Sequence, residues 1–298
     1  SRLPYVWMTN RMMVVQWRED DRTRTLVAEP TDYDLGRNTP FLEHSIRKLP
    51  LPDGKAIGLL FTEHGTVVER LAQLGIAPED VDYLVFDHLH TQDVRRLIGT
   101  VGPAADLGFP DGPVPAQFPN ARLIVARQEL EHVRDVHPFQ ARFHQSSTYA
   151  DIDTSRLLLV DGSVLVAPGV ALLRTPGHTL GNWTIVVNTP GRGILTSSEN
   201  GVAVECYAPH LSKLPGVAAW AREWDYEVLL NFNTPEFASW QYNSMVVEKL
   251  LADPIPGHPH FQQVVPSSEL THHRLAPRIR PTYEHGELTI GRVGPVTA

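Results

Sequence analysis

The sequence has little of three features that would assign it to a particular class of protein. It has one cysteine, Cys206, among 298 residues, so an internal disulfide is excluded and a small buried thiol is expected. No apolar run approaches the ~18 residues that a membrane-spanning helix needs. Basic residues are also scarce: 26 Lys and Arg stand against 34 Asp and Glu, a formal net charge of −8. Without a basic cluster to neutralise phosphates, we expect a soluble protein with neither a nucleic-acid nor a membrane partner.

The chain also lacks signals of export and of several domains. Residues 1–17 do not show the charged and then apolar pattern of a secretory signal, which together with the lone cysteine favours a cytoplasmic location. Internal repeats, low-complexity tracts and long Gly/Ser linkers are missing. The sequence therefore predicts a single domain over residues 1–298, with an irregular N-terminal lead and a C-terminal extension at 266–298.

Helices and short strands alternate along the middle of the chain. Thr66 and Glu69 form a capping box, an apolar stripe follows, and Gly75 stands where a helix would end, so a helix is predicted over 66–75. A buried strand is expected at 83–86. Further strands are expected at 121–125, 156–160, 163–166, 170–174, 183–188 and 193–196, and a helix at 128–132. This pattern indicates an α+β protein in which two mixed β-sheets pack face to face with helices outside.

Histidine is the residue in excess, with fourteen in the chain. His88 and His90 directly follow the strand at 83–86. In an extended segment, side chains two residues apart project to the same side, so these two imidazoles can share one metal ion. The spacing alone is a weak signal, because most such pairs are ordinary surface or core residues.

The context of these histidines resembles the metallo-β-lactamase superfamily. The stretch LGIAPEDVDYLVFDHLH at 74–90 is similar to the helix, turn and strand that deliver the superfamily's first two metal ligands. RTPGHTLG at 174–181 resembles its T-P-G-H-T-x-G turn, which carries His178, and PGH at 256–258 resembles its late P-G-H, which carries His258. The resemblance covers 66–260 and implies a four-layer αβ/βα sandwich of two mixed sheets flanked by helices.

Two positions depart from the superfamily pattern. The usual H-x-H-x-D-H motif is H-x-H-x-Q-D here, with Gln92 in place of the aspartate and Asp93 in place of the last histidine. The later bridging aspartate corresponds to Ser198 or Glu199, and we favour Glu199 because serine is a poor ligand for a divalent ion. Asp93 either replaces the missing histidine as a ligand or only caps the helix that follows. Gln92 either binds a water or substrate or has no role.

The resemblance implies a metal-dependent hydrolase acting on a small-molecule ester, lactone or amide. It implies one or two divalent ions, with Zn expected and Fe or Mn as alternatives. The first ion would activate water and be held by His88, His90 and His178, and the second by Asp93, Glu199 and His258. Tyr207 or His210 is a candidate donor to the developing oxyanion.

The aromatic segment at 207–242 either forms an apolar wall for a hydrophobic substrate or packs in outer helices. Two rival functions share the fold. A carboxylate-rich ligand set also suits an iron or manganese redox enzyme. Loss of the usual aspartate also suits a metal-deficient pseudoenzyme that serves as a binding module. The sequence does not indicate an oligomeric state.

Overall fold

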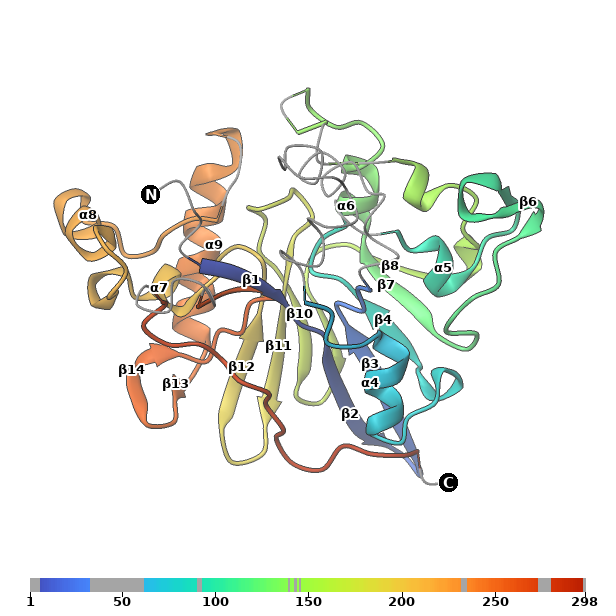
Figure 1. Ribbon diagram of the computed structural model, residues 1–298, viewed down its shortest axis with the longest axis horizontal. Coiled ribbons are helices and arrows are strands. Elements are labelled where there is room, and N and C mark those ends of the chain that lie inside the picture. The colour runs from blue at the N-terminus through green and yellow to red at the C-terminus, as the bar shows by residue number, and fades with distance from the viewer. Residues whose placement is uncertain are drawn as a thin grey trace. The chain divides into compact units, whose positions relative to one another are not determined.

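The computed structural model describes residues 6–32, 62–89, 93–138, 140–141, 144, 146–231, 235–272 and 280–296. The chain divides into two compact units (Figure 1). The N-terminal unit comprises Met12–Leu159 and Val293–Ala298, and the C-terminal unit comprises Ser1–Arg11 and Val160–Arg292. The single domain expected over residues 1–298 stays a prediction.

The N-terminal unit is built on a five-stranded mixed sheet. In spatial order its strands are β2 (Met13–Glu19), β3 (Arg22–Ala28), β4 (Tyr83–Val85), β7 (Arg122–Ala126) and β8 (Leu157–Val160). β2 and β3 form an antiparallel hairpin, whereas β3, β4 and β7 run parallel. The parallel strand β4 therefore lies in the middle of the sheet, where it is buried as the apolar run at 83–86 predicts.

Short helices and one small ribbon complete this unit. The helices are α4 (Val67–Gln73), α5 (Arg95–Ile98) and α6 (Arg127–His132), with 3-10 turns at Pro78–Asp80, Ala105–Leu107, Ser146–Tyr149 and Thr154–Arg156. The ribbon pairs β5 (Pro103–Ala104) with β6 (Phe109–Pro113). The predicted start of α4 is confirmed: Thr66 accepts from the Glu69 amide at 3.2 Å, and Glu69 accepts from the Thr66 amide at 2.8 Å. Gly75 has a positive φ of 72°, as its predicted place after the helix requires.

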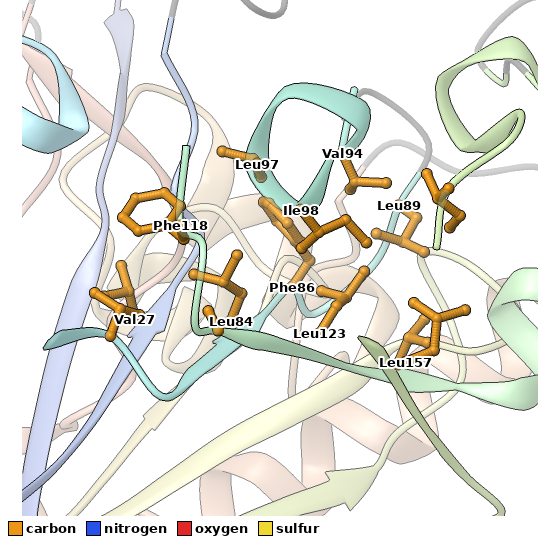
Figure 2. Packing of buried hydrophobic residues seen from close by; sticks show 14 of the residues in the cluster. Val27, Leu84, Phe86, Leu89, Val94, Leu97, Ile98, Phe118, Leu123 and Leu157 are labelled. Carbon is orange, nitrogen blue, oxygen red and sulfur yellow. The ribbon is translucent and has the colours of Figure 1, made fainter. Parts of the chain in front are cut away.

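The core of the N-terminal unit packs α5 against the sheet. Figure 2 shows Leu97 and Ile98 of α5 facing Leu84 and Leu123 of the strands, with Phe118 beside them. All of these side chains are at most 2% exposed. This packing anchors the C-terminal end of β4, where the first histidine motif begins.

The C-terminal unit is built on a four-stranded antiparallel sheet. Its strands follow one another in space as β12 (Gly193–Ser197), β11 (Trp183–Thr189), β10 (Val170–Arg174) and β9 (Val164–Ala167). Each predicted strand at 163–166, 170–174, 183–188 and 193–196 is confirmed to within one residue at either end. The buried side chains of Leu172, Trp183 and Ile185 form its apolar face.

Three helices and two short ribbons complete the C-terminal unit. The helices are α7 (Val204–Tyr207), α8 (Val217–Trp224) and α9 (Ala238–Leu251), with 3-10 turns at Pro209–Leu211 and Pro235–Phe237. β13 (Pro254–Ile255) pairs with β14 (His258–Gln262), and β1 (Val6–Asn10) pairs with β15 (Ser268–His272). Residues beyond 266 thus include the strand β15, which pairs with β1 near the N-terminal end of the described residues.

The α+β class is confirmed, but the irregular N-terminal lead is wrong. Residues 6–28 form β1, β2 and β3, and the hairpin of β2 and β3 is the edge of the five-stranded sheet. Among the described residues, no helix has the length and apolar character needed to cross a membrane.

Candidate functional site

His88 lies three residues beyond Val85, the last residue of β4, and a buried carboxylate holds its ring. Its side chain is 5% exposed, and Nδ1 lies 2.5 Å from Oδ1 of Asp87, which is itself 1% exposed. A carboxylate at this distance accepts a hydrogen bond from Nδ1–H, and the tautomer so fixed carries its lone pair on Nε2. This carboxylate–histidine pairing is the arrangement that orients metal-binding histidines.

Two further buried carboxylates fix the backbone on either side of His88. Glu29 Oε1 accepts from the amide of Asp87 at 2.5 Å, and Glu129 Oε1 accepts from the amide of Leu89 at 2.8 Å. The hydroxyl of Tyr149 donates to the carbonyl of Leu89. The backbone around His88 is therefore held by Glu29, which directly follows β3, and by Glu129 of α6. Sequence reasoning missed these supports, because Glu29 and Glu129 lie far from the motif in the chain.

Asp93 is held by a neighbouring arginine. Both oxygens of its carboxylate accept from the Arg95 guanidinium, at 3.0 and 2.7 Å, and Oδ1 also accepts from the Arg95 amide at 3.2 Å. The guanidinium is shared with Asp106 at 2.7 Å. Asp93 thus accepts from the first amide of α5, whose N-cap residue is Val94, and its roles as a helix cap and as a ligand stay predictions. His90 and Gln92 lie outside the described residues.

His178 lies in the tight loop between β10 and β11. Its amide donates to Oδ1 of Asn200 at 2.9 Å, and the amide of Gly177 donates to the carbonyl of Thr179 at 2.9 Å. A Cβ added to Gly177 would lie 2.5 Å from the Cα of Gln241 and 2.6 Å from Oδ1 of Asn200. The glycine is needed for this close approach of backbones, because its φ is not in the left-handed region.

Glu199 lies two residues beyond the end of β12, in the same part of the unit as His178. Asn231 joins them: its Nδ2 donates to the Glu199 carbonyl at 2.9 Å and lies 3.4 Å from Nδ1 of His178. Oε2 of Glu199, a residue 5% exposed, accepts from the Ser267 hydroxyl at 2.5 Å and the Ser268 amide at 2.9 Å. The alternative residue, Ser198, is fully buried and accepts from Nδ2 of Asn182 at 3.2 Å.

His258 and His210 occupy exposed positions of the C-terminal unit. His258 begins β14, and its ring packs edge-on against Tyr283 with centroids 4.9 Å apart. His210 lies in the turn after α7, where its carbonyl accepts from Arg222 at 3.5 Å. Their proposed roles, as a metal ligand and an oxyanion donor, stay predictions.

Tyr207 and Cys206 lie inside the C-terminal unit on α7. The Tyr207 hydroxyl donates to Oε2 of Glu248 at 2.7 Å, and burial together with that carboxylate raises the pKa of the tyrosine well above its usual value. Burial also raises the pKa of Cys206 to about 11. The thiol is therefore protonated at neutral pH, which fits the small buried thiol that the sequence predicts.

The local chemistry suits a divalent cation, although the described residues alone assemble no complete ligand set. Within the described parts of the chain, no three His, Cys, Asp or Glu side chains are grouped so that they could hold an ion. His88 is nevertheless buried with its tautomer fixed by a carboxylate, and Asn231 donates to the backbone carbonyl of the buried Glu199 and lies 3.4 Å from Nδ1 of His178. Imidazole and carboxylate ligands of this kind are those that zinc, iron and manganese accept.

Comparison with solved structures identifies the fold. AidC, described as a dizinc quorum-quenching lactonase in complex with the product N-hexanoyl-L-homoserine, has a TM-score of 0.52 and 14% identity over 94% of this chain and 81% of that chain. A quorum-quenching N-acyl homoserine lactone lactonase has a TM-score of 0.50 and 16% identity over 89% and 88%. The chain has the fold of the metallo-β-lactamase superfamily.

Curated relatives match a smaller part of the chain. An N-acyl homoserine lactonase of Bacillus sp. is 28% identical over 132 residues, which are 44% of this chain and 43% of that protein. The enzyme of the same name from Bacillus cereus is 25% identical over 134 residues, 45% and 44% of the two chains. The matches thus span less than half the length of these relatives. No family model matches the chain.

Proposed function

We propose that the protein is a metal-dependent hydrolase that opens an ester, lactone or amide of a hydrophobic small molecule. His88, His90 and His178 hold the first ion, with zinc the expected metal. When bound, the ion supplies a water-derived nucleophile near neutral pH and polarises the substrate carbonyl. The observation that carries the proposal is the buried Asp87–His88 pair at the end of β4, in a chain with this fold.

The protein's own residues supply orientation and proton placement. Asp87 keeps the proton of His88 on Nδ1, so that Nε2 can donate its lone pair. Oδ1 of Asn200 accepts from the backbone amide of His178, and Asn231, which donates to the Glu199 carbonyl, lies 3.4 Å from Nδ1 of the His178 ring. Such a preorganised site needs little rearrangement when it binds its metal and substrate.

An open apolar pocket supports a hydrophobic substrate. It has a volume of about 490 Å³ and is lined by α8 and the segments just before and after it, namely by Pro215, Gly216, Val217, Trp220, Tyr226, Val228, Leu229 and Leu230. The rings of Trp220 and Tyr226 stack with centroids 5.0 Å apart. The last lining residue directly precedes Asn231, the neighbour of His178. An apolar substrate tail in this pocket would thus place its polar head near His178.

Two measurements on one preparation test the proposed hydrolase. Protein purified without added metal is analysed for its elements, and the same protein is assayed for opening of N-acyl homoserine lactones and of aryl esters. We expect at least one equivalent of zinc and hydrolysis that a chelator abolishes and zinc restores. A metal-free protein without hydrolytic activity would contradict the proposal, and iron or manganese with electron-transfer activity would favour the redox alternative.

Asp93→Ala tests the second ion, for which we propose Asp93, Glu199 and His258 as ligands. We expect the metal content to fall by one equivalent while the ion at His88 and His178 remains. Asp106→Ala is the matched control, because Asp106 binds the same Arg95 guanidinium but is not a proposed ligand. If both variants keep the parent's metal content, Asp93 is only the cap of α5 and the site is mononuclear.

Trp220→Ala tests the pocket. Removing the ring deletes apolar contacts to a long acyl chain, so KM should rise about tenfold for a ten-carbon substrate and little for a four-carbon one. Trp224→Ala is the control, since this tryptophan is on the same helix, is 61% exposed and does not line the pocket. Equal KM changes in both variants, or none in either, would place the substrate tail elsewhere.

A further inference from the structure

Helix α9 has an inverted distribution of polar and apolar residues. Its buried positions include Gln241, Ser244 and Glu248, which at spacings of three and four residues share one face. Three large apolar side chains of the helix are exposed instead: Trp240, Val247 and Leu250. Burying polar groups costs free energy unless each group finds a hydrogen-bonding partner. The polar face of α9 therefore contributes through its hydrogen bonds rather than through buried apolar area.

Ser244 contacts the loop that carries His178, and Gln241 contacts the neighbouring Asn200. The Ser244 hydroxyl donates to the carbonyl of Pro176 at 2.7 Å, and Nε2 of Gln241 donates to the carbonyl of Asn200 at 2.8 Å. The backbone of α9 also approaches Gly177 so closely that a Cβ there would lie 2.5 Å from the Cα of Gln241. The helix therefore lies directly against this loop.

Glu248 reaches the same loop through Asn200. Nδ2 of Asn200 donates to Oε1 of Glu248 at 2.9 Å and to the carbonyl of Thr175 at 3.0 Å, which fixes the plane of the amide. The other end of that amide, Oδ1, accepts from the amide of His178 at 2.9 Å. The orientation of Asn200, and with it the position of His178, thus depends on the carboxylate of Glu248.

Glu248 is itself held rigidly from two other elements. The Thr184 hydroxyl of β11 donates to Oε1 at 2.7 Å, and the Tyr207 hydroxyl of α7 donates to Oε2 at 2.7 Å. The residue is 0% exposed. A buried carboxylate with this many donors in a dry environment has one low-energy position.

We propose that Glu248 is a positioning residue for the metal centre, which acts through Asn200 to hold His178 in the geometry for ligation. The inference rests on the proposed function, because it takes His178 to be a metal ligand. It also assigns the Tyr207 hydroxyl to support of Glu248. Partners of metal ligands typically change metal affinity by about 10–100-fold when they are removed.

The test compares zinc affinities, measured by competition with a chromogenic chelator. Glu248→Met removes both acceptor oxygens at similar volume, and we expect zinc to bind at least about tenfold more weakly. Glu248→Gln should restore most of the affinity, because its amide oxygen can accept from Asn200 while its NH2 group donates to the Tyr207 hydroxyl. The absorption spectrum of the cobalt-substituted protein should change in Glu248→Met and return in Glu248→Gln.

Glu269→Met is the matched control. Glu269 is also 0% exposed in the C-terminal unit, but it binds Arg11 and His285. Its replacement should lower stability to a similar extent and leave zinc affinity and the cobalt spectrum unchanged. If Glu248→Met does not fold, Asn200→Ala takes its place, since it breaks the same link and should show the same loss of affinity.

The outcomes separate this inference from the proposed function. The inference alone is overturned if the parent protein binds zinc and Glu248→Met, or its substitute Asn200→Ala, folds and binds zinc with the parent's affinity. Equal losses in Glu248→Met and Glu269→Met also overturn it, because general destabilisation would then explain both. A parent protein that binds no divalent metal overturns the proposed function together with the inference.

Discussion

His178→Ala is expected to remove the bound metal and reduce hydrolysis to the level of the metal-stripped protein. The imidazole is a proposed direct ligand, so the loss of metal affinity should exceed the roughly 100-fold upper range for residues that only support ligands. The fold should survive, because the side chain is half-buried and the loop is held by its backbone hydrogen bond to Asn200. Metal content and zinc affinity measure the loss of metal binding, and circular dichroism measures whether the fold survives.

His272→Ala is the control for this variant. His272 lies on β15 in the same unit, is 53% exposed at its side chain and pairs with Glu284 at 2.9 Å. It is not a proposed ligand, so metal content and hydrolysis should equal those of the parent. If His178→Ala kept its metal and its activity, the superfamily's T-P-G-H motif would have lost its function in this chain, and the assignment of the first ion would fail.

Local signals in the sequence predicted several of the elements that lie next to the proposed ligands, but not β14, which begins at His258. The capping box of Thr66 and Glu69 involves neighbouring residues, and it forms as expected. β4 lies between β3 and β7 and is buried, which explains why the run at 83–86 is apolar. The burial of this strand could therefore be predicted from its composition. The strands that precede and follow His178 were predicted for the same reason.

The N-terminal hairpin escaped prediction because charged residues mask its pattern. Asp20 and Asp21 form a two-residue connection between Glu19 and Arg22, which are paired across β2 and β3. Asp20 adopts a positive φ of 52°, as a tight hairpin turn demands. The partly exposed start of β3 alternates arginine and threonine over residues 22–25, which weakens the apolar periodicity on which strand prediction depends.

The supports of the site were harder to predict than its proposed ligands. Glu29 contacts the amide of Asp87 from 58 positions away, and Glu248 contacts Asn200 from 48 positions away. Nothing in the residues around a glutamate shows that it will be buried, because a lone charged residue on a helix is ordinarily solvated. The polar face of α9 becomes interpretable only when its partners in the His178 loop are known.

Among substitutions that add one methyl group in the loop that carries His178, Gly177→Ala is expected to lower the free energy of unfolding the most. The added Cβ would lie 2.5 Å from the Cα of Gln241 and 2.6 Å from Oδ1 of Asn200. A Cα atom cannot rotate away, so either α9 or the loop must move. Overpacking of a well-packed interior typically costs about 1–3 kcal/mol, and we expect a value at or above the upper end because the obstacle is backbone. Zinc affinity should also fall, since the loop carries His178.

Gly286→Ala provides the comparison for this effect in the same unit. No atom lies within 4 Å of a Cβ added there, and its φ is outside the left-handed region, so the change should alter stability by less than about 0.5 kcal/mol. Urea denaturation of both variants, with zinc removed by a chelator, separates loss of packing from loss of bound metal. Coincident unfolding curves for the two variants would show that the loop yields without cost, and the close approach of α9 would then not explain the glycine before His178.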